Sequence, residues 1–283
     1  MTYCFLRFPG GRLKAVTLSY DDGHRSDIRL SETITRYGLK CTFNLCSGLI
    51  GKGEPFLTAE EIREHILDKG HEIAVHGEYH RACGLVRPAD CVRDVLNCRL
   101  ALESRFGGII RGMAYPDSGI RHFENGASYE EVRRILQGLG IAYARSLGGD
   151  NDRFDLPTDW YDWVPTAHHA NPELLDFIEK FHSIRDFDYP ARNTPRLFYL
   201  WGHSFEFENT GWELLETICA RLSGHEDVWY AANTEIYDYV AAYNSLIFSA
   251  DGLTVYNPTL VRLWMYADGA ILTIDPGETK RIG

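Results

Sequence analysis

Two pairs of polar side chains have the types and spacing needed for metal-assisted hydrolysis. Asp21 and Asp22 are adjacent carboxylates at the end of the apolar segment 15–20. Neighbouring strand residues point to opposite faces, so one carboxylate can bind a metal while the other faces a reacting water. His76 and His80 are four residues apart, and their imidazoles can meet at one ion if the backbone between them turns. Two histidines and one carboxylate, with a coordination position left open, form a common catalytic zinc set.

Each pair also has an ordinary structural interpretation. The sequence Asp-Asp-Gly at 21–23 is typical of a solvated turn. An isolated H-x-x-x-H is more often two solvated histidines than a metal site. The sequence contains no H-E-x-x-H, so a zincin-type protease is not indicated.

Further candidates follow along the chain. His203 ends an apolar stretch, and Asp162 and Trp163 lie in the aromatic and acidic segment DWYDW at 159–163. This segment could form a wall on which a sugar stacks, or it could be interior packing of large aromatic rings. Arg111 is a candidate partner for a carboxylate in the site, and a surface position is its alternative. His203 has the alternative of a core histidine bonded to a backbone carbonyl.

The elements that must position these side chains alternate between strands and helices. Strands are predicted at 14–19, 41–45, 72–75, 109–114, 141–144, 196–201 and 228–230. Helices are predicted at 26–37, from 58 to a closing Gly70, and at 89–106, 128–139, 172–184, 210–222 and 233–243. Seven β-α units in succession favour a parallel sheet. Because the polar candidates fall at strand ends, a closed barrel would gather them on one face.

The tail has a different pattern from residue 246 onward. Alternating segments at 246–249, 254–256, 259–266 and 270–274, with turns at 250–252 and 267–269, predict two β-hairpins. We therefore expect a barrel domain over residues 1–245 and a small β appendage over 246–283 that packs on it.

Composition narrows the class of protein further. The chain has 283 residues, 45% of them hydrophobic, and a formal net charge of −11, which argues against a nucleic-acid-binding surface. No apolar run is long enough to span a membrane. The N-terminal residues lack the features of a signal peptide, and seven cysteines occur without a C-x-x-C, which favours free thiols. These features predict a cytoplasmic protein, with a trimmed secreted chain as the alternative.

Taken in order, the candidate residues resemble the motifs of a known family. Asp-Asp-Gly at 21–23, H-x-x-x-H at 76–80, Arg111 before Tyr-Pro, D-x-x-D-W at 159–163 and L-x-x-H at 200–203 match five ordered motifs. They are those of the polysaccharide deacetylases, carbohydrate esterase family four, which share the nodulation-protein homology domain. The resemblance extends from about Leu13 to Ser204.

The resemblance implies a fold and a set of roles. The fold would be a distorted (β/α)7 barrel, here with the short C-terminal β-hairpin appendage. Asp22, His76 and His80 would hold one divalent metal ion, usually zinc in this family. Asp21 would be the general base and His203 the general acid. The supporting residues would be Arg111, which holds Asp21; Asp162, which tunes His203; Tyr115, whose backbone N–H meets the oxyanion; and Trp163, which lines the substrate pocket.

Three departures from the family pattern matter. Gly77 stands where a serine or threonine usually braces the metal loop, which could loosen that loop. Tyr115 precedes Pro116 where the family has the reverse order, so a neighbour of Tyr115 could be the oxyanion donor. Asp159-Trp160 duplicates the fourth motif, although D-x-x-D-W favours the second pair.

The sequence therefore predicts a metal-dependent hydrolase that removes N-acetyl or O-acetyl groups from a carbohydrate. Two alternatives remain open. One is a hydrolase of a small non-sugar C–N bond, such as that of a cyclic ureide, on the same barrel. The other is a non-catalytic carbohydrate-binding barrel.

Overall fold

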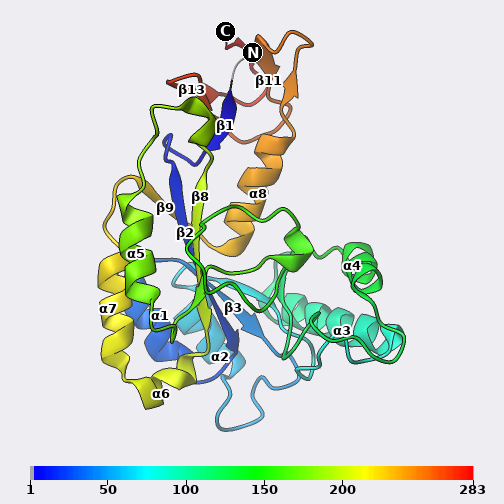
Figure 1. Cartoon of the computed structure of the whole chain (residues 1–283). Helices are drawn as coiled ribbons and strands as arrows, with labels where there is room; N and C mark the ends of the chain where they lie inside the picture. The colour runs from blue at the N-terminus through cyan, green and yellow to red at the C-terminus, as the bar shows by residue number, and fades with distance from the viewer. Residues whose placement is uncertain (1–2, 283) are drawn as a thin grey trace.

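The computed structural model of the protein describes residues 3–282, and its centre is a curled parallel sheet (Figure 1). The eight strands are β2 (Lys14–Asp22), β3 (Cys41–Leu45), β4 (Glu72–Val75), β5 (Gly112–Ala114), β6 (Tyr143–Arg145), β7 (Ala167–His168), β8 (Arg196–Gly202) and β9 (Val228–Tyr230). Their order is β6-β5-β4-β3-β2-β8-β7, and β9 pairs with the start of β2. Every pair is parallel. The predicted distorted (β/α)7 barrel is confirmed.

Helices cover the outside of this sheet. They are α1 (Asp27–Arg36), α2 (Ala59–Ile62), which continues as a π-helical turn (Arg63–Leu67), α3 (Pro88–Phe106), α4 (Tyr129–Gly138), α5 (Leu174–Ser183), α6 (Phe207–Thr210), α7 (Trp212–Leu222) and α8 (Asn233–Asn244). In Figure 1, α1, α5 and α7 lie on one side and α3 and α4 on the other. The capping box expected at the start of α2 is present, since Thr58 Oγ1 accepts from Glu61 N and Glu61 accepts from Thr58 N.

The strands differ from the prediction at two places that matter for function. Strand β2 continues to Asp22, so the adjacent carboxylates lie on the strand rather than in a turn after it. Strand β7 was not predicted, because two residues are too few to show a periodic pattern. It joins the sheet by pairing with β8 and brings His168 beside Trp201.

The tail builds two small antiparallel sheets. One contains β1 (Cys4–Arg7), β12 (Leu263–Ala267) and β13 (Ala270–Ile274), and the other contains β10 (Ile247–Phe248), β11 (Thr254–Tyr256) and β14 (Thr279–Arg281). Both predicted hairpins are present, as β10–β11 and β12–β13. The first strand of the chain joins the tail, while the boundary between residues 245 and 246 remains a prediction.

Two clusters of apolar side chains form the core. The larger lies between the sheet and its covering helices. The smaller joins the amino ends of β2 and β8 to α8 and the tail, and includes Ala15, Tyr199, Tyr239 and Met265. The tail therefore packs at the amino ends of these strands and leaves the carboxyl ends to the polar residues.

Two further predictions concern cysteines and membranes. All seven cysteines are free thiols, as predicted, and six of them are buried. Among residues 3–282, no helix is long and apolar enough to cross a bilayer.

Candidate metal and active site

Asp22, His76 and His80 come together at the carboxyl ends of β2 and β4. Asp22 Oδ1 lies 3.5 Å from His76 Nε2 and 3.3 Å from His80 Nε2. Asp22 and His80 both have positive φ angles, 80° and 56°, which bulky L-residues adopt rarely. The backbone is thus held in unusual conformations at two of the three residues that aim at one point.

The hydrogen bond of His76 leaves its other nitrogen suited to a metal. His76 Nδ1 lies 2.9 Å from the backbone oxygen of Ala114, so it carries the proton and donates. Nε2 then presents a lone pair to the cluster, and this buried atom has no hydrogen-bond partner among the described residues. A histidine that ligates a metal usually donates its other N–H in this way. Zinc bonds of 2.0–2.2 Å in a tetrahedron place ligand atoms about 3.3 Å apart, close to the spacings here. The residues therefore fit a divalent metal.

The protonation states of the cluster also suit a cation. Burial disfavours the Asp22 carboxylate, but the neighbouring His76 and His80 imidazoles outweigh it and lower the pKa of Asp22 to about 2. Burial and the nearby His76 ring lower the pKa of His80. At neutral pH the site offers a carboxylate and a neutral imidazole, the forms in which these side chains bind metal.

The loop that carries the histidines is braced from α3. Gly77 has φ +77°, and a Cβ atom there would lie 2.4 Å from Asp94 Oδ2. Asp94 Oδ1 accepts from the backbone N–H of Tyr79 at 3.2 Å, and Gly77 O accepts from Ser47 N at 3.3 Å. The brace expected from a side chain at position 77 is thus supplied by Asp94, for which the glycine leaves room.

Asp21 is held by Arg145 and not by Arg111, so the predicted Arg111–Asp21 pair is wrong. Asp21 Oδ2 forms a buried ion pair with Arg145 Nη2, and Oδ1 accepts from Asn44 Nδ2 at 2.8 Å. Arg111 instead pairs with Asp238, 2.6 Å away at the surface. The reason is position on the strand, because Arg111 precedes β5 whereas Arg145 is the last residue of β6.

Asp162 does not reach His203, so the predicted tuning pair is also wrong. Its carboxylate accepts from Ser146 Oγ and lies 3.2 Å from Arg121 Nη2. The duplicate residue Asp159 accepts from Tyr161 N at 2.9 Å and caps a short 3-10 turn. The acidic residue beside His203 is Glu206, three positions further along, with Oε1 3.5 Å from His203 Nδ1.

Trp163 and Tyr115 also lie elsewhere than predicted. Trp163 is 1% exposed and packs against Tyr143 and Tyr199, with ring centroids 5.3 and 4.7 Å away, so it cannot line an open pocket. The N–H of Tyr115 donates to Arg145 O at 2.9 Å and is not free for an oxyanion. The aromatic rings near the predicted acid are Phe205 and Trp201, whose centroids lie 5.2 and 5.8 Å from that of His203. The guanidinium of Arg145 lies 4.4 Å from the Trp201 ring centroid.

A second group of polar side chains borders His203. His168 Nε2 and His169 Nε2 each lie 3.1 Å from Glu206 Oε2. Burial opposes the charged form of His203, but Glu206 and the charges of Asp21 and Asp22 outweigh it and raise the pKa of His203.

Sequence reasoning missed Arg145, Asn44, His168, His169 and Glu206. Arg145 directly follows a predicted strand, the position that selected the other candidates. The doublet His168-His169 lay inside a segment expected to be irregular. For Asn44 and Glu206 the sequence carries no signal, since both matter only through the side chains they contact.

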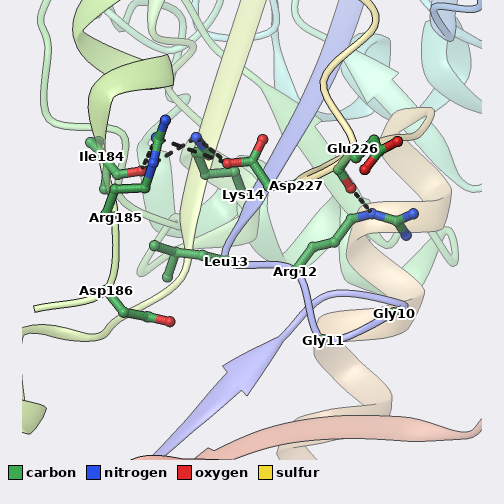
Figure 2. Close-up of a pocket in the computed structure, with 10 residues that line it drawn as sticks. All are labelled: Gly10, Gly11, Arg12, Leu13, Lys14, Ile184, Arg185, Asp186, Glu226 and Asp227. Atoms are coloured by element: carbon green, nitrogen blue, oxygen red, sulfur yellow. Dashed lines mark hydrogen bonds and ion pairs between the residues drawn. The ribbon is translucent and has the colours of Figure 1, made fainter.

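A separate hollow of about 400 Å³ contains none of these residues (Figure 2). Lys14 at its wall is 2.8 Å from Asp227, and Arg12 donates to the backbone oxygen of Glu226 at 2.8 Å. Lys14 begins β2 and Asp22 ends it, so the two places lie about 26 Å apart along the strand. The cations of this hollow are matched by acidic residues and carbonyls, and it is separate from the candidate active site.

The architecture is that of a (β/α) barrel with polar residues at the carboxyl ends of its strands. Known proteins that resemble this chain have the same fold. Residues 10–144 match the model of the polysaccharide deacetylase family. No match was found among curated protein sequences.

Solved structures share the fold at low sequence identity. A putative polysaccharide deacetylase from Mycobacterium smegmatis is 18% identical, with a TM-score of 0.58, over 85% of this chain and 94% of that one. A probable polysaccharide deacetylase from Pseudomonas aeruginosa is 16% identical, with a TM-score of 0.58, over 82% and 92%. A carbohydrate esterase family 4 pseudoenzyme from Bacillus anthracis is 16% identical, with a TM-score of 0.51, over 83% and 68%. The chain covers 55% of the length of a Streptococcus pyogenes deacetylase.

Proposed function

We propose that this protein is a metal-dependent deacetylase that removes N-acetyl or O-acetyl groups from a carbohydrate, with zinc as the metal. The observation that carries the proposal is the unpaired Nε2 of His76 among the described residues, aimed at Asp22 and His80. The family match over residues 10–144 supports the substrate class and the reaction.

Asp22, His76 and His80 would hold the cation. When bound, a divalent cation polarises a carbonyl oxygen and lowers the pKa of a water molecule. Asp21 takes the proton of the attacking water. Its buried carboxylate is fixed by Asn44 on one oxygen and Arg145 on the other, and each oxygen keeps further acceptor capacity.

His203 supplies the proton that the leaving group needs. An amide nitrogen leaves only when it is protonated, so the acid must hold its proton near neutral pH. The nearby carboxylates raise the pKa of His203, which favours this role. Trp201 lies beside His203 and offers an apolar ring to the bound sugar.

The test combines a metal assay with acetate release. Asp21→Asn should lower turnover at least about 10²-fold while the metal stays bound, because general acid–base groups contribute 10²–10⁴-fold. His76→Ala should lose the metal itself, as measured by elemental analysis of the purified protein. Undiminished acetate release by Asp21→Asn would refute the role of Asp21, and full metal retention by His76→Ala would refute the ligand set.

Substrate panels separate this proposal from its rivals. Acetylated sugar oligomers should release acetate, whereas cyclic ureides should remain intact. Hydrolysis of ureides alone would move the protein to non-sugar C–N chemistry. Binding of oligosaccharide without turnover would indicate a non-catalytic barrel; the family 4 pseudoenzyme shares this fold.

A further inference from the structure

The group formed by His168, His169 and Glu206 has two physical explanations. Its three ligand-type atoms lie within 4.8 Å of one another, as they do in the Asp22 cluster. It is therefore either a second metal site or a hydrogen-bonded carboxylate. The positions of the ring protons distinguish the two.

The backbone fixes the proton of His168 on the side of Glu206. The N–H of Ala170 donates to His168 Nδ1 at 3.2 Å, so Nδ1 is an acceptor and the neutral ring carries its proton on Nε2. This is the opposite of His76, whose Nδ1 donates to a carbonyl and leaves Nε2 free. A metal ligand needs the arrangement of His76. His168 Nε2, which carries the proton, therefore faces Glu206 Oε2, 3.1 Å away.

Three nitrogen atoms surround one of the two carboxylate oxygens of Glu206. Oε2 lies 3.1 Å from His168 Nε2, from His169 Nε2 and from the backbone nitrogen of His203. Although burial opposes the charge, these imidazoles hold the pKa of Glu206 well below its usual range, so it is ionised. The other oxygen, Oε1, is left facing His203 Nδ1 at 3.5 Å.

The packing around His169 fixes the imidazole in its position next to Glu206. Its ring is 1% exposed and stacks on Phe207 and Tyr20, with centroids 4.2 and 5.6 Å away. Gly202 leaves room for it, because a Cβ atom there would lie 2.1 Å from His169 Nδ1. The imidazole cannot turn away from Glu206 without disturbing both aromatic rings.

We propose that Glu206 is the positioning residue of His203 and that His168 and His169 hold it in place. The proposal rests on the function proposed above, in which His203 is the acid. Glu206 Oε1 faces Nδ1–H of His203, so Nε2–H is the proton presented to the leaving group. The separation of 3.5 Å is longer than a formed hydrogen bond, and such bonds commonly tighten when substrate binds. Glu206 therefore has the role, tuning His203, that the family resemblance implied for Asp162.

The decisive variant is Glu206→Gln, which keeps the size of the side chain and removes its charge. We expect kcat to fall on the order of 10²-fold with KM changed less than about 3-fold, since a group that acts only in the transition state alters kcat. Bound metal should stay at one ion per chain. Glu206→Asp should recover part of the loss, and the matched control Glu208→Gln, at an exposed glutamate on α6, should behave as wild type.

Three results would overturn the proposal. They are an unchanged kcat, a loss expressed only in KM, and a fall from two bound ions to one in Glu206→Gln, which would make the group a second metal site. A readout without substrate separates this proposal from the proposed function. In protein labelled with ¹⁵N-histidine, the Nδ1–H signal of His203, assigned with His203→Gln, should shift in Glu206→Gln but not in Glu208→Gln. If that shift occurs and the wild type deacetylates no sugar, the proposed function fails and the Glu206–His203 contact stands.

Discussion

Asp21 depends on Arg145 for its charge to remain buried. Asp21 is 2% exposed and Arg145 is fully buried, and the two form an ion pair inside the barrel. Removing one partner of such a pair leaves an uncompensated charge and costs about 3–5 kcal/mol. An exposed pair is worth at most about 1 kcal/mol.

This contrast gives a matched test of which arginine serves the base. Arg145→Met should lower the free energy of unfolding by about 3–5 kcal/mol, measured by urea denaturation, and reduce acetate release. Arg111→Met removes the surface pair with Asp238 and should cost less than about 1 kcal/mol. Equal losses in the two variants would contradict the assignment of Arg145.

Some of the candidate site was predictable from residue order and some was not. Asp22, His76 and His80 were brought together as expected, because Asp22 ends β2 and the two histidines follow β4, and the carboxyl ends of these strands meet on one face. Arg111 failed because the predicted strand began three residues too early: the prediction placed Arg111 inside the strand, whereas β5 begins at Gly112 and Arg111 precedes its amino end. Glu206 could not be found, since only the fold reveals that it faces three imidazoles.

The loop after β4 works as a unit with α3. Gly77 combines a positive φ with close contact to Asp94, and Asp94 in turn holds the backbone of Tyr79. A side chain at position 77 would push Asp94 away, and the histidines on the same loop would move with it.

Gly77→Ala should therefore weaken metal binding at least about 10-fold, as groups that orient ligands typically contribute 10- to 100-fold. The control is Gly108→Ala, because Gly108 has nearly the same φ, +76°, and a methyl group there would meet no atom within 4 Å among the described residues. The Gly108→Ala variant should lose only about 1 kcal/mol of stability and keep its metal affinity. Metal titration of both variants decides, and an unchanged affinity in Gly77→Ala would show that the loop does not need the Asp94 brace.

Most helices and strands were predictable because their patterns are local. The strands at 41–45, 72–75 and 228–230 have the predicted bounds, and the capping box at Thr58 marks the start of α2. Strand β7 escaped because its two residues owe their conformation to pairing with β8. Because β7 was not predicted, the position of His168 beside the candidate site was not predicted either.

The stability of the whole protein should fall in mild acid because of a buried histidine. His71 is 6% exposed, and burial together with the charge of Lys40 lowers its pKa to about 4. In the unfolded chain the imidazole of His71 is protonated as the pH falls through about 6.5, whereas in the folded chain it is protonated only near pH 4. This contribution is complete above pH 6.5 and is lost as the pH falls to 4, a difference of about 3 kcal/mol.

His71→Gln should flatten this dependence. Urea denaturation at pH 7 and pH 4.5 should show a smaller loss of stability in His71→Gln than in the wild type. His122→Gln changes an exposed histidine and should leave the dependence unaltered. If His71→Gln and the wild type lose the same free energy, another group causes the acid sensitivity.

The pairing of β1 with β12 has a consequence for synthesis of the chain. Cys4 is aligned with Ala267, roughly 260 residues later, and both ends of the chain lie together at the tail (Figure 1). A ribosome adding about 5–20 residues per second makes β12 roughly 13 to 50 s after β1. During that interval β1 has no partner strand, whereas β2, β3 and β4 can already pair. The sheet of β1, β12 and β13 can therefore close only after the strands that carry the metal-binding residues have been made.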